Sequence, residues 1–377
     1  MKVKGFIGFL VILIVMFFLL SVSIMADEGI KIGNIACLTG PLATYGESHR
    51  NAVLLAVDLA NANGGILGKQ VEVITEDDQG DPVVGASAAL KLVNNNDILV
   101  IVGPIPSTIG LAVSSIVEEA KVPTVVTGTS PAITPNKHFV TRSCWTDDFQ
   151  GVVMARFCLN ELNAKTAAIL YDIGNDYAKS VSEVFEKTFN NEGGEVITVQ
   201  THPTQAVDFR SQLSKIKLKK PDILFFPDFY NDANLIGKQA SDIGVKATFV
   251  GTDGWDSSEL DLPSLEGAYY CSHFSKESPR VETKYFINEY TKRYNKEPDL
   301  LAIMGYDATL IALNGIREAG KLDRVAVADA IAKTKGLKAA QGDITFDENG
   351  DPMTLPAAIL QIKGGKTQYL KSYQAMQ

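Results

Sequence analysis

Residues 98–127 read ILVIVGPIPSTIGLAVSSIVEEAKVPTVVT and contain two apolar runs on either side of a longer amphipathic stretch. The runs at 98–102 and 124–127 predict strands, and residues 107–120 predict a helix that begins at Ser107. A strand, a helix and a strand at this spacing indicate a βαβ unit with parallel strands. This stretch therefore predicts an α/β fold.

The same alternation continues on both sides of this unit. The preceding residues predict strand 30–38, helix 47–61, strand 70–76 and helix 82–94. A second series follows residue 145, with predicted helices at 150–162, 177–190, 209–217 and 231–243 and strands at 166–171, 196–200, 222–226 and 247–251. Three helical stretches then precede two closing strands at 357–362 and 368–373. Two such series predict an α/β protein with two doubly wound parallel-sheet lobes.

The N-terminus has the pattern of a secretory signal peptide. A charged start, Met1-Lys2-Val3-Lys4, precedes an apolar run at 5–20 and small residues that end at Ala26. We expect cleavage after Ala26, which leaves 351 residues (377 minus 26) in the periplasm or another extracytoplasmic space. The alternative is an uncleaved membrane anchor, because the apolar run is nearly long enough to cross a bilayer. No cysteine lies at the junction, so we expect no lipid anchor there.

Charge and motif content exclude several classes of function. The net charge is −9 and the pI about 5.1, so we expect no nucleic-acid partner. The four cysteines match no zinc spacing and are expected to be mostly buried apolar residues. The four histidines form no metal motif, and the chain has no G-x-S-x-G, P-loop or strand-linked G-x-G-x-x-G. We therefore predict no enzyme, no metal and no cofactor, and a monomeric binding protein.

Polar residues follow several predicted strands, at the edge where open α/β sheets bind ligands. Ser107 begins the helix after strand 98–102, and a helix N-terminus with a hydroxyl suits a carboxylate, although a plain N-cap serine is the commoner case. Gly128 and Ser130 follow the next strand. Asp253 follows strand 247–251, where it could pair with an ammonium group or only cap its own turn. These residues predict a polar ligand site between the lobes.

Aromatic residues also lie at predicted strand ends or helix starts. They are Tyr45, Trp145, Tyr177, Phe229 and Tyr230. For each of them alone, core packing is a commoner role than ligand contact.

Residues 32–46, IGNIACLTGPLATYG, resemble the opening of the leucine–isoleucine–valine binding proteins of ABC transporters. A second stretch, AVDLANANGGILGKQVEVITEDDQGDP at 56–82, is similar to another signature of that family. Further matching motifs follow in the expected order: VGPIPS, VPTVVTGTS, RSCWTDDFQG, DYAKS, GTDGW, GYDA and ITFDENGDP. The resemblance covers the chain from about Ile30 to about Met353.

The resemblance implies a type I periplasmic binding fold that closes on its ligand like a Venus flytrap. It implies an N-terminal lobe of residues 27–145 plus 274–346 and a C-terminal lobe of residues 146–273 plus 347–377. The three chain crossings would lie near Trp145, Phe274 and Phe346. The positions of the family's first-lobe disulfide hold Gly80 and Pro106 here, so that bridge cannot form.

The resemblance also assigns roles to site residues. Ser107 and Ser130 match hydroxyl residues that bind the ligand carboxylate. Gly128 matches a backbone carbonyl that takes the ligand ammonium, and Asp253 matches an acidic residue that pairs with it. The remaining expected ligand contacts are aromatic: Tyr45 and Tyr177 face the ligand, Phe229 stands where other members have a tyrosine, Tyr230 could supply that hydroxyl, and Trp145 at the hinge would reshape the pocket.

The function implied is that of an extracytoplasmic solute-binding receptor. It would capture a small amino acid (branched-chain, other aliphatic or aromatic) and deliver it to the permease subunits of an ABC transporter. The alternatives are the same fold with an amide or aromatic acid as ligand, and a membrane-anchored sensory ectodomain.

Overall fold

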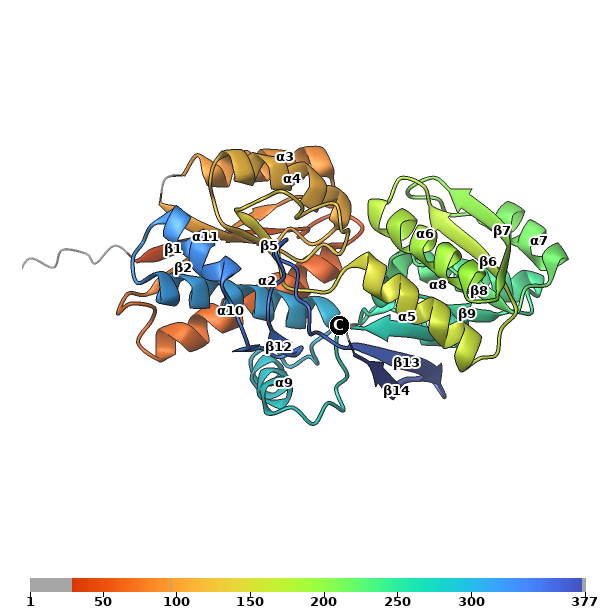
Figure 1. Cartoon of the computed structure of the whole chain (residues 1–377). Helices are drawn as coiled ribbons and strands as arrows, with labels where there is room; N and C mark the ends of the chain where they lie inside the picture. Colours follow the sequence, from red (N-terminus) through yellow and green to blue (C-terminus); the bar gives the residue numbers. More distant parts are fainter. Residues whose placement is uncertain (1–28, 96, 375–377) are drawn as a thin grey trace, which may run out of the picture.

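The computed structural model describes residues 29–95 and 97–374 as two α/β lobes side by side (Figure 1). One sheet has five strands and the other has seven, and a small two-stranded sheet lies beside them. The predicted fold class is therefore confirmed. The predicted signal peptide, residues 1–26, lies outside the described residues.

The first sheet is entirely parallel and has the strand order β2-β1-β3-β4-β5. Its strands are β1 (Ile30–Ala36), β2 (Val71–Asp77), β3 (Ile98–Val102), β4 (Thr124–Val126) and β5 (Val140–Arg142). The helices of this lobe are α2 (Ala43–Ala62), α3 (Pro82–Val93), α4 (Ser107–Glu119), α9 (Val281–Tyr294), α10 (Leu300–Ala319) and α11 (Arg324–Ala332). Helices α3 and α4 cover one face of the sheet, and α2 and α10 cover the other (Figure 1). All five residues of β3 are buried, because both faces of this central strand are covered.

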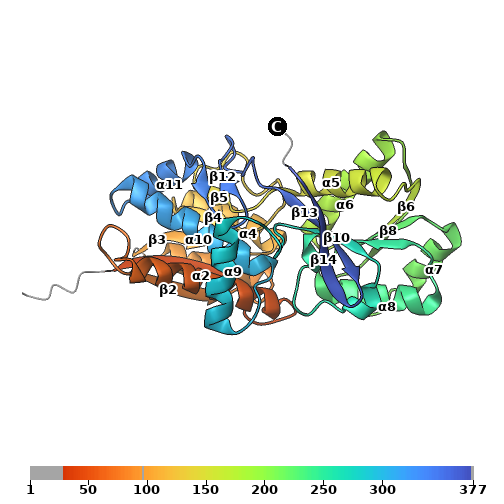
Figure 2. The same cartoon turned by 90° about the horizontal axis from the view of Figure 1, so that it is seen from below.

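The second sheet repeats this order in its parallel part, β7-β6-β8-β9-β10. Its strands are β6 (Thr166–Asp172), β7 (Glu195–His202), β8 (Ile223–Phe225), β9 (Thr248–Val250), β10 (Tyr269–Ser272), β13 (Ala357–Lys363) and β14 (Lys366–Tyr373). Strands β13 and β14 extend it antiparallel beyond β10 (Figure 2). The helices are α5 (Asp147–Asn160), α6 (Asp176–Asn191), α7 (Arg210–Lys219) and α8 (Tyr230–Ile243).

Some short strands were not predicted from the sequence. They are β5, β10 and the pair β11 (Leu337–Lys338) and β12 (Asp343–Ile344). Each has only two to four residues, which is too short for a period-2 pattern to be recognised. Two 3₁₀ turns, Asp253–Trp255 and Leu262–Leu265, also follow β9.

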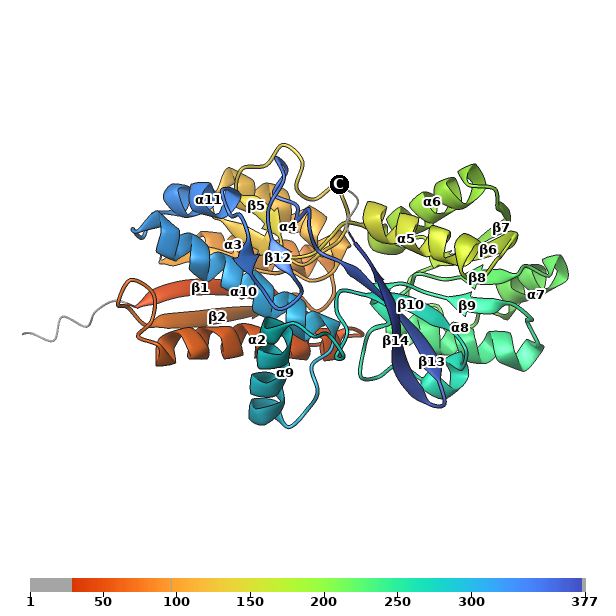
Figure 3. The same cartoon turned by 60° about the horizontal axis from the view of Figure 1, so that its bottom comes forward.

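The third chain crossing lies later than predicted. The resemblance implied a crossing near Phe346, but Arg142 donates its backbone N–H to Gly350 and its side chain to Asp351. Thr354 still donates to the carbonyl of Asp343. These contacts keep residues 347–354 against the first lobe, so the chain crosses just before β13, as Figure 3 allows the reader to follow.

Helix α10 forms much of the first-lobe core. Within the part of the chain that the structure describes, it alone is long and apolar enough to cross a membrane, but 83% of its apolar window is buried in the protein. Burial of this kind is typical of a core helix. All four cysteines, Cys37, Cys144, Cys158 and Cys271, are buried free thiols, as the sequence predicted for most of them.

A buried histidine–aspartate pair lies in the second lobe. His202 Nε2 is 3.3 Å from Asp228 Oδ2, and its Nδ1 is 3.0 Å from the carbonyl oxygen of Pro203. Both partners are acceptors, so the ring is held with a proton on each nitrogen. Burial lowers the pKa of His202, but the hydrogen bond and charge of Asp228 outweigh burial and raise it to about 9.

This pair predicts a loss of stability in alkali. Because the folded pKa is above the ordinary value of 6.5, the stabilisation is fully present below pH 6.5 and is lost as the pH rises through 9. Between pH 6 and 10 we expect the melting temperature of the wild type to fall by roughly 2–4 °C more than that of His202→Gln. Thermal denaturation at each pH measures this difference. Parallel curves for the two proteins would show that the pair does not titrate in this range.

Candidate functional site

A small cavity lies between the lobes, beyond the carboxyl ends of both sheets. Its volume is about 40 Å³, and its wall comes from the turns after β3, β4, β8 and β9 and from the N-termini of several helices. Because a buried water needs about 10–15 Å³ of such space, the cavity holds only a few waters. A larger ligand therefore requires the lobes to move apart or the wall to rearrange.

Hydrogen bonds close the lobes around this cavity. The hydroxyl of Tyr45 donates to the carbonyl of Gly254, and that of Tyr230 donates to the carbonyl of Pro41 at 3.2 Å. The backbone N–H of Asp176, at the start of α6, donates to Thr108 Oγ1 at 3.3 Å. Each bond joins a first-lobe residue to a second-lobe residue, so this is the closed arrangement of the two lobes.

The first lobe contributes a polar wall that begins at Ser107. Ser107 lies at the N-terminus of α4, where the first backbone N–H groups have no partner within the helix. Its Oγ accepts from the backbone N–H of Ser130 at 3.0 Å, so its own hydrogen is free to donate. Thr127 and Thr129 line the same wall, and Thr127 already donates to the carbonyl of Pro104 at 3.1 Å. Ser107 can therefore donate to an anion, whereas the Thr127 hydroxyl can only accept.

Gly128 and Ser130, two predicted ligand contacts, are not among the residues that line the cavity. The Gly128 carbonyl accepts from Arg142 Nη1 at 2.9 Å, and the Ser130 carbonyl accepts from Arg142 Nη2 at 3.0 Å. Successive residues of an extended chain point to opposite sides. Thr127 and Thr129 thus face the cavity, one position away from the predicted residues.

Asp253 provides the charge of the site. Among the residues that the structure describes, it is the only charged side chain that lines the cavity. Its Oδ1 accepts from the Tyr177 hydroxyl at 2.6 Å, and its Oδ2 lies 3.1 Å from His273 Nε2. The carboxylate is 4% exposed and keeps lone pairs for one more donor. The alternative, in which Asp253 only caps its own turn, does not account for these two side-chain contacts.

Three predicted aromatic residues line the cavity: Tyr45, Tyr177 and Phe229. The rings of Tyr177 and Phe229 are stacked with centroids 5.3 Å apart, and Tyr45 meets Phe229 edge-on at 5.9 Å. Burial and the charge of Asp253 raise the pKa of Tyr177, so its hydroxyl remains a donor. Tyr230 packs against Tyr45 but does not reach the wall, because its hydroxyl is directed to Pro41.

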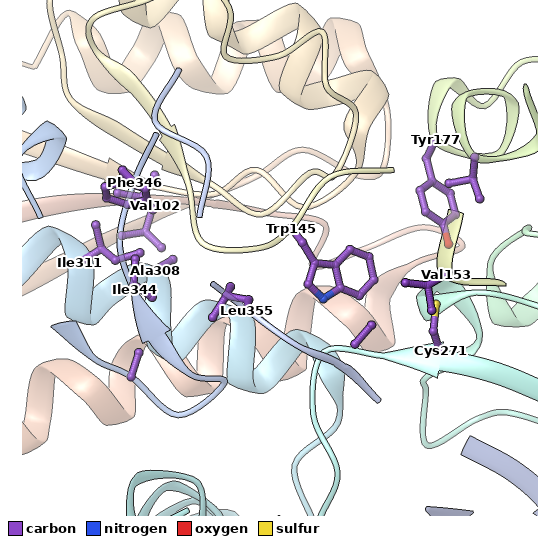
Figure 4. Close-up of a cluster of buried hydrophobic side chains, with 14 of the residues drawn as sticks. Val102, Trp145, Val153, Tyr177, Cys271, Ala308, Ile311, Ile344, Phe346 and Leu355 are labelled. Atoms are coloured by element: carbon purple, nitrogen blue, oxygen red, sulfur yellow. The ribbon is translucent and has the colours of Figure 1, made fainter. Parts of the chain in front are cut away.

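Trp145 does not line the cavity either, contrary to the prediction. Its indole is stacked on the His273 ring with centroids 3.6 Å apart, and its Nε1 donates to the carbonyl of Pro356 at 3.3 Å. Figure 4 shows the ring between the first-lobe residues around Leu355 and the second-lobe residues Tyr177 and Cys271. Trp145 therefore packs where the lobes meet, and it contacts Asp253 only through the His273 ring.

Several apolar residues of the wall were not found from the sequence. They are Ile105, Leu300, Leu301 and Met304, the last three from the first turns of α10. In the sequence these residues belong to an ordinary apolar helix, and nothing in its pattern marks one end as a ligand wall. Together with Phe229 they form the aliphatic and aromatic part of the wall.

Asp147, the first residue of α5, lies close to the polar end. It is fully buried, and Gln150 Nε2 donates to its Oδ1 at 3.0 Å. Burial, together with the charge of Asp253, raises the pKa of Asp147 to about 7. The polar end therefore holds a second carboxyl group that is partly protonated near neutrality.

The fold and the site define a two-lobed α/β binding protein with a small-molecule cavity between its lobes. The chain belongs to the periplasmic binding protein family, whose model matches residues 29–367. This is a family of solute-binding proteins and not of enzymes.

Similar proteins cover nearly the whole chain. The Leu/Ile/Val-binding protein BraC3 of Rhizobium johnstonii is 32% identical over 348 residues, which is 91% of this chain and 94% of that protein. The crystal structure of a leucine-binding protein, LivK, from Thermotoga maritima is similar with a TM-score of 0.86 and 31% identity, covering 91% of this chain and 98% of that one. The LivJ protein of Streptococcus pneumoniae, in complex with isoleucine, has a TM-score of 0.87 and 29% identity over 92% and 100% of the two chains.

Proposed function

We propose that this protein binds a branched-chain or other aliphatic L-α-amino acid between its lobes and delivers it to an ABC transporter. The observation that carries the proposal is the composition of the cavity wall, which combines one carboxylate and several hydroxyls with aliphatic side chains. Similar proteins described as binding leucine, isoleucine and valine support the same ligand class.

The polar end suits the zwitterionic part of an amino acid. An α-carboxylate can accept from the Ser107 hydroxyl and from the free N–H groups at the start of α4, where the helix dipole also favours an anion. The ammonium group can donate to Asp253 and to the Thr127 hydroxyl. An aromatic acid or a neutral amide would leave the Asp253 charge without a cation inside a closed cleft, which is unfavourable.

The apolar end suits an aliphatic side chain. Ile105, Leu301 and Met304 supply flexible or branched apolar surface, and each buried methylene of the ligand contributes about 0.8 kcal/mol. A methionine in the wall also allows the pocket to adapt to side chains of somewhat different shape. We therefore expect leucine, isoleucine and valine to bind with affinities that differ modestly.

Calorimetric titration of the purified protein tests the proposal. We expect at least one of leucine, isoleucine and valine to bind with a Kd of about 1 μM or less, which corresponds to about 8 kcal/mol. Benzoate and an aliphatic amide serve as the ligands without an ammonium group. Binding of benzoate or the amide with no measurable amino-acid affinity would contradict the proposal.

Delivery to a transporter requires export of the chain. We predict that the mature protein begins at Asp27, because a small residue, Ala26, precedes the acidic junction. N-terminal sequencing of the protein isolated from its native host measures this directly. A retained Met1 would instead support the membrane-anchored sensory ectodomain.

A further inference from the structure

We propose that His273 is a positioning residue for the ligand's ammonium group: as a neutral donor stacked on Trp145, it directs the Asp253 carboxylate into the cavity. The inference rests on the proposed binding of an amino acid. His273 does not line the cavity and acts through Asp253.

The first support is the hydrogen-bond geometry of the His273 ring. Its Nε2 lies 3.1 Å from Asp253 Oδ2, so this nitrogen carries a proton and donates it to the carboxylate. Its Nδ1 is buried and has no hydrogen-bond partner within residues 29–95 and 97–374. A second proton on Nδ1 would be a buried donor without an acceptor, which is unfavourable. The geometry thus favours the neutral ring with its proton on Nε2.

The second support is the rigidity of the arrangement. The indole of Trp145 is parallel to the His273 ring within 10°, with centroids 3.6 Å apart, and both side chains are almost fully buried. The other carboxylate oxygen is held by the Tyr177 hydroxyl, which itself accepts from the backbone N–H of Gly254 at 2.9 Å. Two donors on opposite oxygens leave the Asp253 carboxylate little freedom to turn away from the cavity.

The charge of this network explains why a neutral histidine suits the site. Two acidic groups interact with His273: Asp253 through its hydrogen bond and Asp256 through its charge, and Lys276 also interacts with Asp256. With His273 neutral, the positive charge that compensates Asp253 must come from the ligand. A protonated His273 would supply that charge itself and would compete with the ammonium group.

Two substitutions separate positioning from packing. His273→Leu removes the donor, whereas His273→Gln keeps an N–H donor of similar reach but cannot titrate. The probes are L-leucine and its 2-hydroxy analogue, 2-hydroxy-4-methylpentanoate, which lacks the cation. Since hydrogen bonds to charged groups contribute about 1.5–3 kcal/mol, we expect His273→Leu to weaken leucine binding about tenfold or more. The affinity for the hydroxy acid should change much less, and His273→Gln should retain most of the leucine affinity.

His202→Gln is the matched control for these affinity measurements, because this buried histidine also pairs with an aspartate of the second lobe but does not line the cavity.

The outcomes are distinct. Equal loss of leucine and hydroxy-acid affinity in His273→Leu, or unchanged leucine affinity, overturns the positioning role. A wild type that binds no amino acid while remaining folded overturns the proposed function itself.

Discussion

Asp253→Asn is expected to weaken amino-acid binding by about 2–5 kcal/mol, or roughly 30-fold to several thousand-fold, because it removes one partner of a desolvated charge pair. Asp253 is 4% exposed and is the charged residue of the cavity wall within the described chain. Water is largely excluded from the closed cleft, so an ammonium group there needs an anion beside it. Calorimetric titration of both proteins with the same amino acid measures the loss.

The fold should tolerate this substitution better than binding does. Asparagine keeps an oxygen that accepts from Tyr177 and much of the turn chemistry, so the cost to folding is confined to the contact with His273. Asp256→Asn is the matched control, because Asp256 is a partly buried acid of the same turn that accepts a hydrogen bond from Ser272 but does not line the cavity. Equal affinity losses for both variants would show that long-range charge, and not contact at Asp253, determines binding.

Arg142→Met is expected to lower the free energy of unfolding by about 3–5 kcal/mol, because it removes one partner of a buried ion pair and leaves the other one uncompensated. The Arg142 side chain is fully buried, and its Nε donates to Asp351 Oδ1 at 2.5 Å. Its two Nη groups also hold the carbonyls of Gly128 and Ser130, next to the threonines of the cavity wall. The substitution therefore leaves a carboxylate and two carbonyls without their donor.

Urea denaturation of the unliganded protein measures this loss, with Arg156→Met as the control. Arg156 forms an exposed pair with Glu192 at 2.8 Å, and such pairs contribute about 0–1 kcal/mol. The double variant Arg142→Met, Asp351→Leu should recover part of the stability, because it also removes the uncompensated carboxylate. A loss of less than about 1 kcal/mol in Arg142→Met would contradict this role of the pair.

The sequence by itself determined the class of fold. The apolar run at 98–102, helices at βαβ spacing and the second series after residue 145 predicted two parallel-sheet lobes, which the structure contains. Strand and helix periodicity is a local property, so it can be read from neighbouring residues. The same reading found Ser107 and Asp253, because each follows a well-formed strand and ligands bind beyond strand ends.

Only the tertiary structure decided which neighbouring residues form the wall. Thr127 and Thr129 line the wall, and Gly128 and Ser130 do not. Beyond the end of β4 the sequence pattern does not show which residues face the cavity. The buried Arg142 decides this, because it donates to the carbonyls of Gly128 and Ser130. Leu300, Leu301 and Met304 reach the cavity because α10 packs against the first sheet from a position almost two hundred residues later in the chain. His273 and Trp145 meet behind Asp253 for the same reason. Contacts between residues far apart in sequence arise from the packing of whole elements, and local patterns do not encode them.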